Sequence, residues 1–210
     1  HGTIPGQNAG ATIQFYVEGT DALGSVSQFP AAGVDSRAMV QVDPGVPTGP
    51  HHTFRILMTD DDYDAMIEPI NRMSNHRLRG TVVCHDSEVY YDVGVRLKGS
   101  GFSRGGARTV FNLRFGADDL LFGVHDVVAI DRTGVPWWLC ASHRELTLKH
   151  IANRAGDIPM MMDDAIYFVG PDANLNGTAQ LLGARYDDAF LESQYEKGGD
   201  GTRFKFDLLY

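Results

Sequence analysis

The sequence has little of the chemistry that marks a zinc or redox protein. It contains only two cysteines, Cys84 and Cys140, too few for a disulfide framework and without the CxxC spacing of zinc and redox sites. A single disulfide between them in an oxidising compartment is the alternative interpretation, and two buried free thiols are the favoured one. The eight histidines show no HExxH or comparable spacing. The sequence therefore predicts no zinc site, and the ligands of any other metal stay unknown.

An excess of positive charge is also missing. The chain of 210 residues has 18 lysines and arginines against 27 aspartates and glutamates, which gives a net charge of −9. Such a surface repels the phosphates of nucleic acid, so nonspecific binding to nucleic acid is excluded as a function class. No apolar run approaches the length of a membrane span. We expect neither a nucleic-acid partner nor a membrane span in this segment.

A proline- and glycine-rich run, PGVPTGP at 44–50, divides the chain into two unlike parts. Before it, the alternation of apolar and polar residues in TIQFYVEGTD at 12–21 and in RAMVQV at 37–42 predicts strands only. After it, strand and helix patterns are mixed, which indicates an α+β fold. The predicted divisions are β-sandwich strands over 1–43, a linker over 44–52 and an α+β unit over 53–210.

Apolar spacing and capping residues predict the elements of the α+β unit. Strands are expected over 53–58, 79–86, 88–98, 109–116, 126–131, 164–170 and 178–185, and later helices over 139–155 and 187–195. A first helix begins after Thr59 as N-cap, carries aspartates at 60–62 in its first turn, and is interrupted at Pro69. These aspartates fan around the helix axis, which favours capping over calcium binding. Gly156 is the expected C-cap of the 139–155 helix.

The most informative stretch is YDVGVRLKGSGFSRGGARTVFNLRF, which occupies 91–115. Apolar residues alternate with Gly94, Arg96 and Lys98, and a loop of glycine, serine and arginine follows. Unhindered backbone amides beside basic side chains are the combination that binds phosphate. The residues expected to contact phosphate are Lys98, Gly99, Ser100, Arg104 and Arg108. A flexible hairpin with solvated arginines is the alternative, because no P-loop or GxGxxG spacing is present.

This stretch resembles the CotH (spore-coat protein H) kinase-like family, in which a strand of the form V-x-[RK]-[RK]-G-[SN] precedes a loop and a basic or aromatic strand. The resemblance continues, in the family's order, through FRILMTDDDYDAMI, DVVAIDRTG, RELTLKHIANRAGDIP and AIYFVGPDANLNGTAQLLGARYDDAFLESQYEKGGDG. It covers residues 53–210, and the ordered series carries it rather than any single motif. The strands before the linker resemble the end of the Ig-like β-sandwich that often precedes such domains in large secreted bacterial proteins.

The resemblance implies an atypical kinase-like mixed sheet with helices, located outside the cell. It implies ATP-dependent phosphoryl transfer to serine or threonine of surface proteins, with Mg²⁺ or another divalent metal. Lys98 and Glu145 would be the catalytic pair, with Lys98 on the nucleotide phosphates. Two features depart from the family pattern. Arg185 stands where many members have glutamate, and the family's metal-binding carboxylates lie beyond the end of this sequence, so an incomplete domain is expected.

Other interpretations compete with the kinase one. A non-catalytic structural or adhesive module that contacts neighbouring subunits of a surface assembly fits the same pattern, and carbohydrate binding by the sandwich strands is a third reading. Lys98 can be an edge-strand lysine, Glu145 a solvated helix residue, and Asp131 a turn cap instead of a site residue. Trp137 and Trp138 are expected in a core or at an interface.

Overall fold

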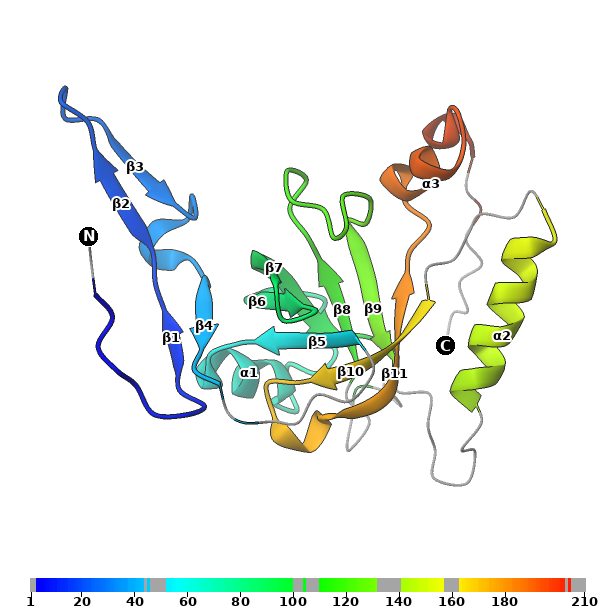
Figure 1. Cartoon of the computed structure of the whole chain (residues 1–210), viewed down its shortest axis with the longest axis horizontal. Helices are drawn as coiled ribbons and strands as arrows, with labels where there is room; N and C mark the ends of the chain where they lie inside the picture. The colour runs from blue at the N-terminus through cyan, green and yellow to red at the C-terminus, as the bar shows by residue number, and fades with distance from the viewer. Residues whose placement is uncertain are drawn as a thin grey trace.

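The computed structural model describes residues 3–43, 45, 52–99, 104, 110–131, 141–156, 163–202 and 204; for 141–145, 163 and 178–182 it describes the backbone alone. Seven strands of this part close into a barrel in the order β10, β11, β9, β8, β7, β6, β5 (Figure 1). Their bounds are β5 (His52–Leu57), β6 (Leu78–Cys84), β7 (Glu88–Leu97), β8 (Phe111–Arg114), β9 (Val127–Asp131), β10 (Asp163–Val169) and β11 (Gly177–Ala184). Neighbours are antiparallel except β5 and β10, whose parallel pairing closes the ring. The α+β class is thereby confirmed.

The interior of the barrel is a packed apolar core. Val93, Val95 and Leu97 of β7 are at most 2% exposed, so the predicted apolar face of this strand points inward. Phe111 and Leu113 of β8 are fully buried beside them. The other largest fully buried side chains are Phe54, Phe168, Met39, Ile56, Leu121, Ile130, Ile166 and Val82. This core fixes which residues of each strand point outward.

Three α-helices lie outside the barrel in the described part of the chain: α1 (Asp60–Ile67), α2 (Ala141–Arg154) and α3 (Asp188–Gln194). The predicted cap of α1 is confirmed, since the Thr59 side chain accepts a hydrogen bond of 3.2 Å from the Asp62 N–H. Gly156, after α2, has the left-handed φ of 88° expected of a C-terminal glycine. The 3-10 helices are η1 (Gly33–Asp35), η2 (Ala173–Leu175) and η3 (Gly198–Asp200). None of the described helices combines the length and apolar character that crossing a membrane requires.

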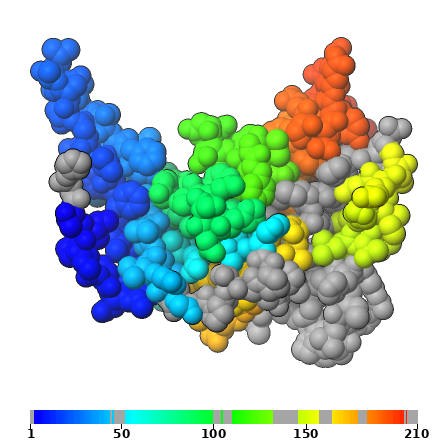
Figure 2. All heavy atoms as spheres, in the orientation of Figure 1, coloured from blue at the N-terminus to red at the C-terminus, as the bar shows by residue number. Residues whose placement is uncertain are grey.

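The strands before the linker form two small sheets of their own. β1 (Thr12–Gln14) pairs with β4 (Met39–Gln41), and β2 (Val17–Thr20) pairs with β3 (Val26–Phe29). The β2–β3 ribbon projects away from the barrel (Figures 1 and 2). This N-terminal segment carries large apolar side chains that are exposed, at Tyr16, Val17, Leu23, Val26 and Phe29. Whether 1–43 belongs to a separate sandwich domain stays a prediction.

The segment that leads into β4 is nevertheless anchored to the barrel. Asp92 on β7 accepts hydrogen bonds from the Ser36 hydroxyl, at 3.0 Å, and from the Arg37 N–H, at 2.6 Å. The Thr81 hydroxyl on β6 donates to the Arg37 carbonyl and accepts from the Met39 N–H, at 2.5 and 2.9 Å. These polar contacts, together with the edge-to-face contacts of Phe15 and Phe29 with Tyr91 of β7, hold the strands before the linker against β6 and β7.

The cysteine prediction is confirmed in the part of it that can be compared. Cys84 is fully buried and free, and burial, followed by the charge of Glu88, raises the pKa of its thiol to about 12. Cys140, Trp137 and Trp138 lie outside the described residues.

Candidate functional site

Lys98 and Asp131 meet at one end of the barrel wall. Lys98 directly follows β7, and its N–H donates to the Val110 carbonyl at 2.8 Å, which fixes the backbone at the strand end. Its ammonium forms an ion pair with the carboxylate of Asp131, the last residue of β9. The two side chains are 36% and 42% exposed. Lys98 is therefore not a lone edge lysine, and Asp131, whose role the sequence left open, is its counter-ion.

Arg104 holds the first residue of the glycine-rich loop, Gly99, in place. Gly99 has φ 96°, a left-handed conformation that glycine adopts without strain, and its carbonyl accepts from the Arg104 Nε at 2.7 Å. Arg104 is only 7% exposed. It also donates to the carbonyls of Arg72 and Ser74, at 3.2 and 2.9 Å, and to the Asn75 side chain at 2.9 Å. The Arg104 guanidinium thus ties the loop to the turn at 72–75 and would have to leave these acceptors to contact a phosphate.

The remaining predicted site residues cannot be placed against Lys98. Ser100 and Arg108 lie outside the described residues, as does the side chain of Glu145. The backbone of Glu145 is in α2, which contacts β10 and β11. In the barrel, β8 and β9 lie between β11 and β7. Of the described carboxylates, Asp131 is the one paired with Lys98.

The same outer wall carries a row of arginines that the strand register brings together. We call Arg77, Arg96, Arg114 and Arg185 the arginine wall. Arg96 is outward on β7 and pairs with Asn112 of β8, and two residues along β8 Arg114 pairs with Val127 of β9. Arg185 directly follows β11, whose last residue pairs with Val128. Four chain segments therefore present cations on one face of the barrel.

Arg77 packs over this wall rather than projecting from it. It donates to the Gly94 carbonyl at 3.1 Å and to both the carbonyl and the side-chain oxygen of Asn112, at 3.0 and 2.5 Å. These bonds explain why Asn112 is only 9% exposed although it lies on the outward face of β8. A β-carbon at position 94 would meet the Arg77 side chain at 3.0 Å, so Gly94 makes room for it.

The arginines of the wall repel one another, and the charge of Asp126 offsets part of this repulsion. The pKa of Arg77 is lowered to about 10, mostly by burial and then by the charges of Arg96, Arg114 and Arg185, while Asp126 opposes the shift. Burial likewise lowers the pKa of Arg96, with further contributions from Arg104, Arg185 and Arg114. A bound anion would relieve this repulsion, because a guanidinium sheds its proton only at high pH. The wall is chemically suited to oxyanions.

Arg96 and Arg114 alternate with apolar residues in the 91–115 stretch, but the sequence did not assign either of them to the site. Their alternation with apolar residues was the available signal. Arg77 and Arg185 lie outside strands, and no local pattern placed them near β7. Within the described residues, no group of three or more histidines, cysteines, aspartates or glutamates could hold a metal ion.

Comparison with known proteins does not assign the chain to a family. No family model matches the sequence, and no curated protein matches it. The function is therefore argued from the chemistry of the site.

Proposed function

We propose that this chain is a nucleotide-phosphate-binding module, a CotH-like extracellular protein kinase domain that transfers phosphate from ATP to serine or threonine of surface proteins. The observation that carries the proposal is the position of Lys98: it ends a strand, begins the glycine-rich loop and is held by a carboxylate, Asp131. A lysine oriented by an acidic partner is what contact with nucleotide phosphates requires. Arg96, two residues earlier on the same face, adds positive charge.

The exchange of partners at Lys98 is the chemical basis of binding. A phosphate oxygen would take the place of Asp131 at the Lys98 ammonium or share it. Both side chains are more than one third exposed, so a ligand can reach them without opening the core.

Magnesium is implied by the family resemblance but does not fit the described residues. Asp131 is a single carboxylate already paired with Lys98, and the described part of the chain holds no metal-binding group of three. We therefore derive no transfer step through a metal, and the proposal for these residues is limited to phosphate binding.

The test is the thermal stability of the full chain with and without ATP and magnesium. Ligand that binds the native state raises the melting temperature, and Lys98→Ala should remove that shift without loss of the fold. Arg79→Ala is the matched control, because Arg79 is an exposed cation on the next strand, β6, and should leave the shift intact. A wild-type protein that shows no shift at saturating ATP would reject nucleotide binding.

A second candidate function is a non-catalytic module that contacts neighbouring subunits of a surface assembly. The anchoring of Arg104 to the 72–75 turn favours it, because one of the predicted phosphate contacts is used for structure. The exposed apolar side chains of the β2–β3 ribbon also favour it. Absence of an ATP-dependent shift, together with self-association or partner binding through 12–29, would support this candidate over the first.

A further inference from the structure

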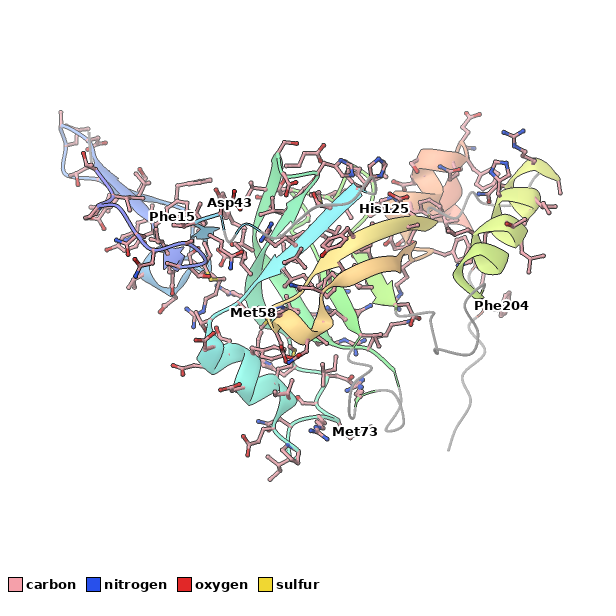
Figure 3. The ribbon with its side chains drawn as sticks, turned by 60° about the horizontal axis from the view of Figure 1, so that its bottom comes forward. Phe15, Asp43, Met58, Met73, His125 and Phe204 are labelled. Atoms are coloured by element: carbon pink, nitrogen blue, oxygen red, sulfur yellow. The ribbon has the colours of Figure 1, made fainter. Side chains whose placement is uncertain are left out.

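A groove separates the N-terminal strand β4 from the outer wall of the barrel. Its volume is about 540 Å³, and pockets that bind ligands have about 300–1,000 Å³. Figure 1 shows β4 between β1 and the barrel, and Figure 3 labels Asp43, which lines the groove, where the chain passes from the N-terminal strands to the barrel. The groove is therefore built by two parts of the fold that are held together by few contacts.

On one side the groove follows the free edge of β4. All three residues of this strand, Met39, Val40 and Gln41, line it. Successive side chains of a strand point to opposite faces, so three consecutive lining residues indicate that the groove borders the strand edge. Since β4 pairs with β1 alone, its other edge is the one beside the barrel.

The backbone groups along this edge are only partly used. The Val42 N–H donates to the Ala11 carbonyl at 2.9 Å, so in the alternation of an antiparallel pair Met39 and Gln41 direct their backbone groups away from β1. The Met39 N–H donates to the Thr81 hydroxyl at 2.9 Å. In the part of the chain that the structure describes, the N–H and carbonyl of Gln41 have no hydrogen-bond partner.

On the other side the groove lies against the outward face of the barrel sheet. Val83 on β6 is the register partner of Val89 on β7, and Tyr91 follows two residues along on the same face. Val89 is 40% exposed, and Val40 across the groove is 44% exposed. The groove thus combines an open strand edge with apolar side chains that no described part of the chain covers.

The charged groups of the groove favour a cationic occupant. Asp43, after β4, and Asp86, in the turn between β6 and β7, both line it and are exposed. Arg55, the cation among the described lining residues, already donates to the Gln41 side chain at 2.7 Å. The net charge of −9 also attracts a basic partner over a longer distance.

We infer that this groove binds an extended peptide segment of another protein, with apolar side chains at alternate positions and lysine or arginine beside them. The backbone of the segment pairs with Gln41 and adds a third strand to the β1–β4 sheet. Two-stranded sheets are marginally stable and their open edges accept such strands. The apolar side chains of the segment cover Val83 and Val89, and a basic side chain lies near Asp86. This site does not depend on the nucleotide site at Lys98.

Fluorescence anisotropy of the full chain with a labelled synthetic peptide tests the inference. The probe has about nine residues, roughly 30 Å when extended, and alternates valine with threonine between two terminal lysines. It should bind, and the same peptide with glutamate in place of both lysines should bind at least about threefold more weakly. No binding of the lysine peptide would overturn the inference, as would equal binding of the two peptides.

Amide hydrogen exchange tests the backbone pairing in the wild-type protein. The peptide should protect the Gln41 amide, because this N–H gains an acceptor. The Met39 amide is the internal control, since it already donates to Thr81 and should exchange at the same rate with and without peptide. An unprotected Gln41 amide in the complex would overturn strand addition.

Variants locate the binding. Val89→Lys should lower the association constant by at least about tenfold, because it places a cation on the apolar floor beside a basic peptide. Val26→Lys is the matched control, since Val26 is an exposed valine on the β2–β3 ribbon. Asp86→Asn should lower the constant by about two- to fivefold, and asparagine tolerates the left-handed φ of 54° there. Equal loss in Val26→Lys would mean nonspecific repulsion and overturn the inference.

A second copy of this chain is another possible occupant, and sedimentation over a range of concentrations detects it. A monomer whose Gln41 amide exchanges rapidly without peptide supports the inference. Protection of that amide without peptide, in a dimer or in a monomer, would overturn it, because a second copy or another segment of this chain then fills the groove. Circular dichroism of each variant ensures that lost binding is not lost folding, and the exchange measurement needs no variant.

Discussion

The ammonium of Lys98 and the carboxylate of Asp131 join the ends of β7 and β9, two strands that are not neighbours because β8 lies between them. Between them lies Val110, the residue before β8, whose carbonyl also accepts the Lys98 N–H. This contact places the start of the glycine-rich loop over the outer wall of the barrel. It also means that a phosphate bound at Lys98 competes with a carboxylate already present.

Asp131→Asn should change the free energy of unfolding by about 1 kcal/mol or less. Both side chains are more than one third exposed, and ion pairs of that kind contribute little because water and salt screen them. Urea unfolding at low and high salt measures the effect, which should shrink further at high salt. A loss well above about 2 kcal/mol would mean that the pair is structural and not available to a ligand.

Arg104→Ala should destabilise the fold by about 2–3 kcal/mol, because its nearly buried guanidinium serves four acceptors and their oxygens would lose this donor. Arg79→Ala, an exposed arginine, should stay within about 0.5 kcal/mol of wild type in the same chemical unfolding experiment. Equal stability of the two variants would show that Arg104 does not anchor the loop.

Leu113→Ala should cost about 2–5 kcal/mol, since Leu113 is fully buried in the barrel and the substitution leaves a cavity. The same substitution at Leu23, which is 92% exposed on the N-terminal segment, should cost almost nothing. The two variants make the same substitution at a fully buried position and at an almost fully exposed one. A large effect at Leu23 would indicate that another protein surface covers it in solution.

Cys84 should resist alkylation in the folded chain at about pH 8–9, because only the thiolate reacts and burial raises the pKa of this thiol to about 12. Unfolding should restore labelling of Cys84, and site-resolved mass spectrometry measures the labelled fraction. The sign of the linked stability follows: above an ordinary pKa of 9.0 the unfolded thiol releases its proton while the folded one keeps it, so stability falls between pH 9.0 and about 12. Cys84→Ala should lose that component of the pH dependence, and rapid labelling of native Cys84 would contradict the burial.

Asp92→Ala should loosen the N-terminal strands from the barrel, because the Asp92 carboxylate accepts from both Ser36 and Arg37. The Arg37 amide should exchange with solvent faster, whereas amides of the barrel core should not change. Asp92→Asn is the control, since asparagine keeps an acceptor oxygen and tolerates the left-handed φ of 53° at this position. Unchanged protection at Arg37 in the alanine variant would show that Asp92 does not hold the segment.

The strands and helices of this protein were largely predictable from local sequence. Apolar alternation placed β5 to β11 to within a few residues, and Thr59 and Gly156 marked helix ends where the structure has them. These features depend on neighbours a few positions away, so the sequence contains them directly. The outward position of Lys98 and Arg96 followed from the same period of two.

Tertiary structure alone decided which side chains meet. Closure of the barrel by parallel pairing of β5 with β10, the partnership of Lys98 with Asp131, and the groove between β4 and the outer wall of the barrel all join segments far apart in sequence. Register between strands sets these contacts, and a shift of one residue would turn every side chain to the other face. Local pattern gives the face of each strand; the packing of the whole core selects the register, and with it the site.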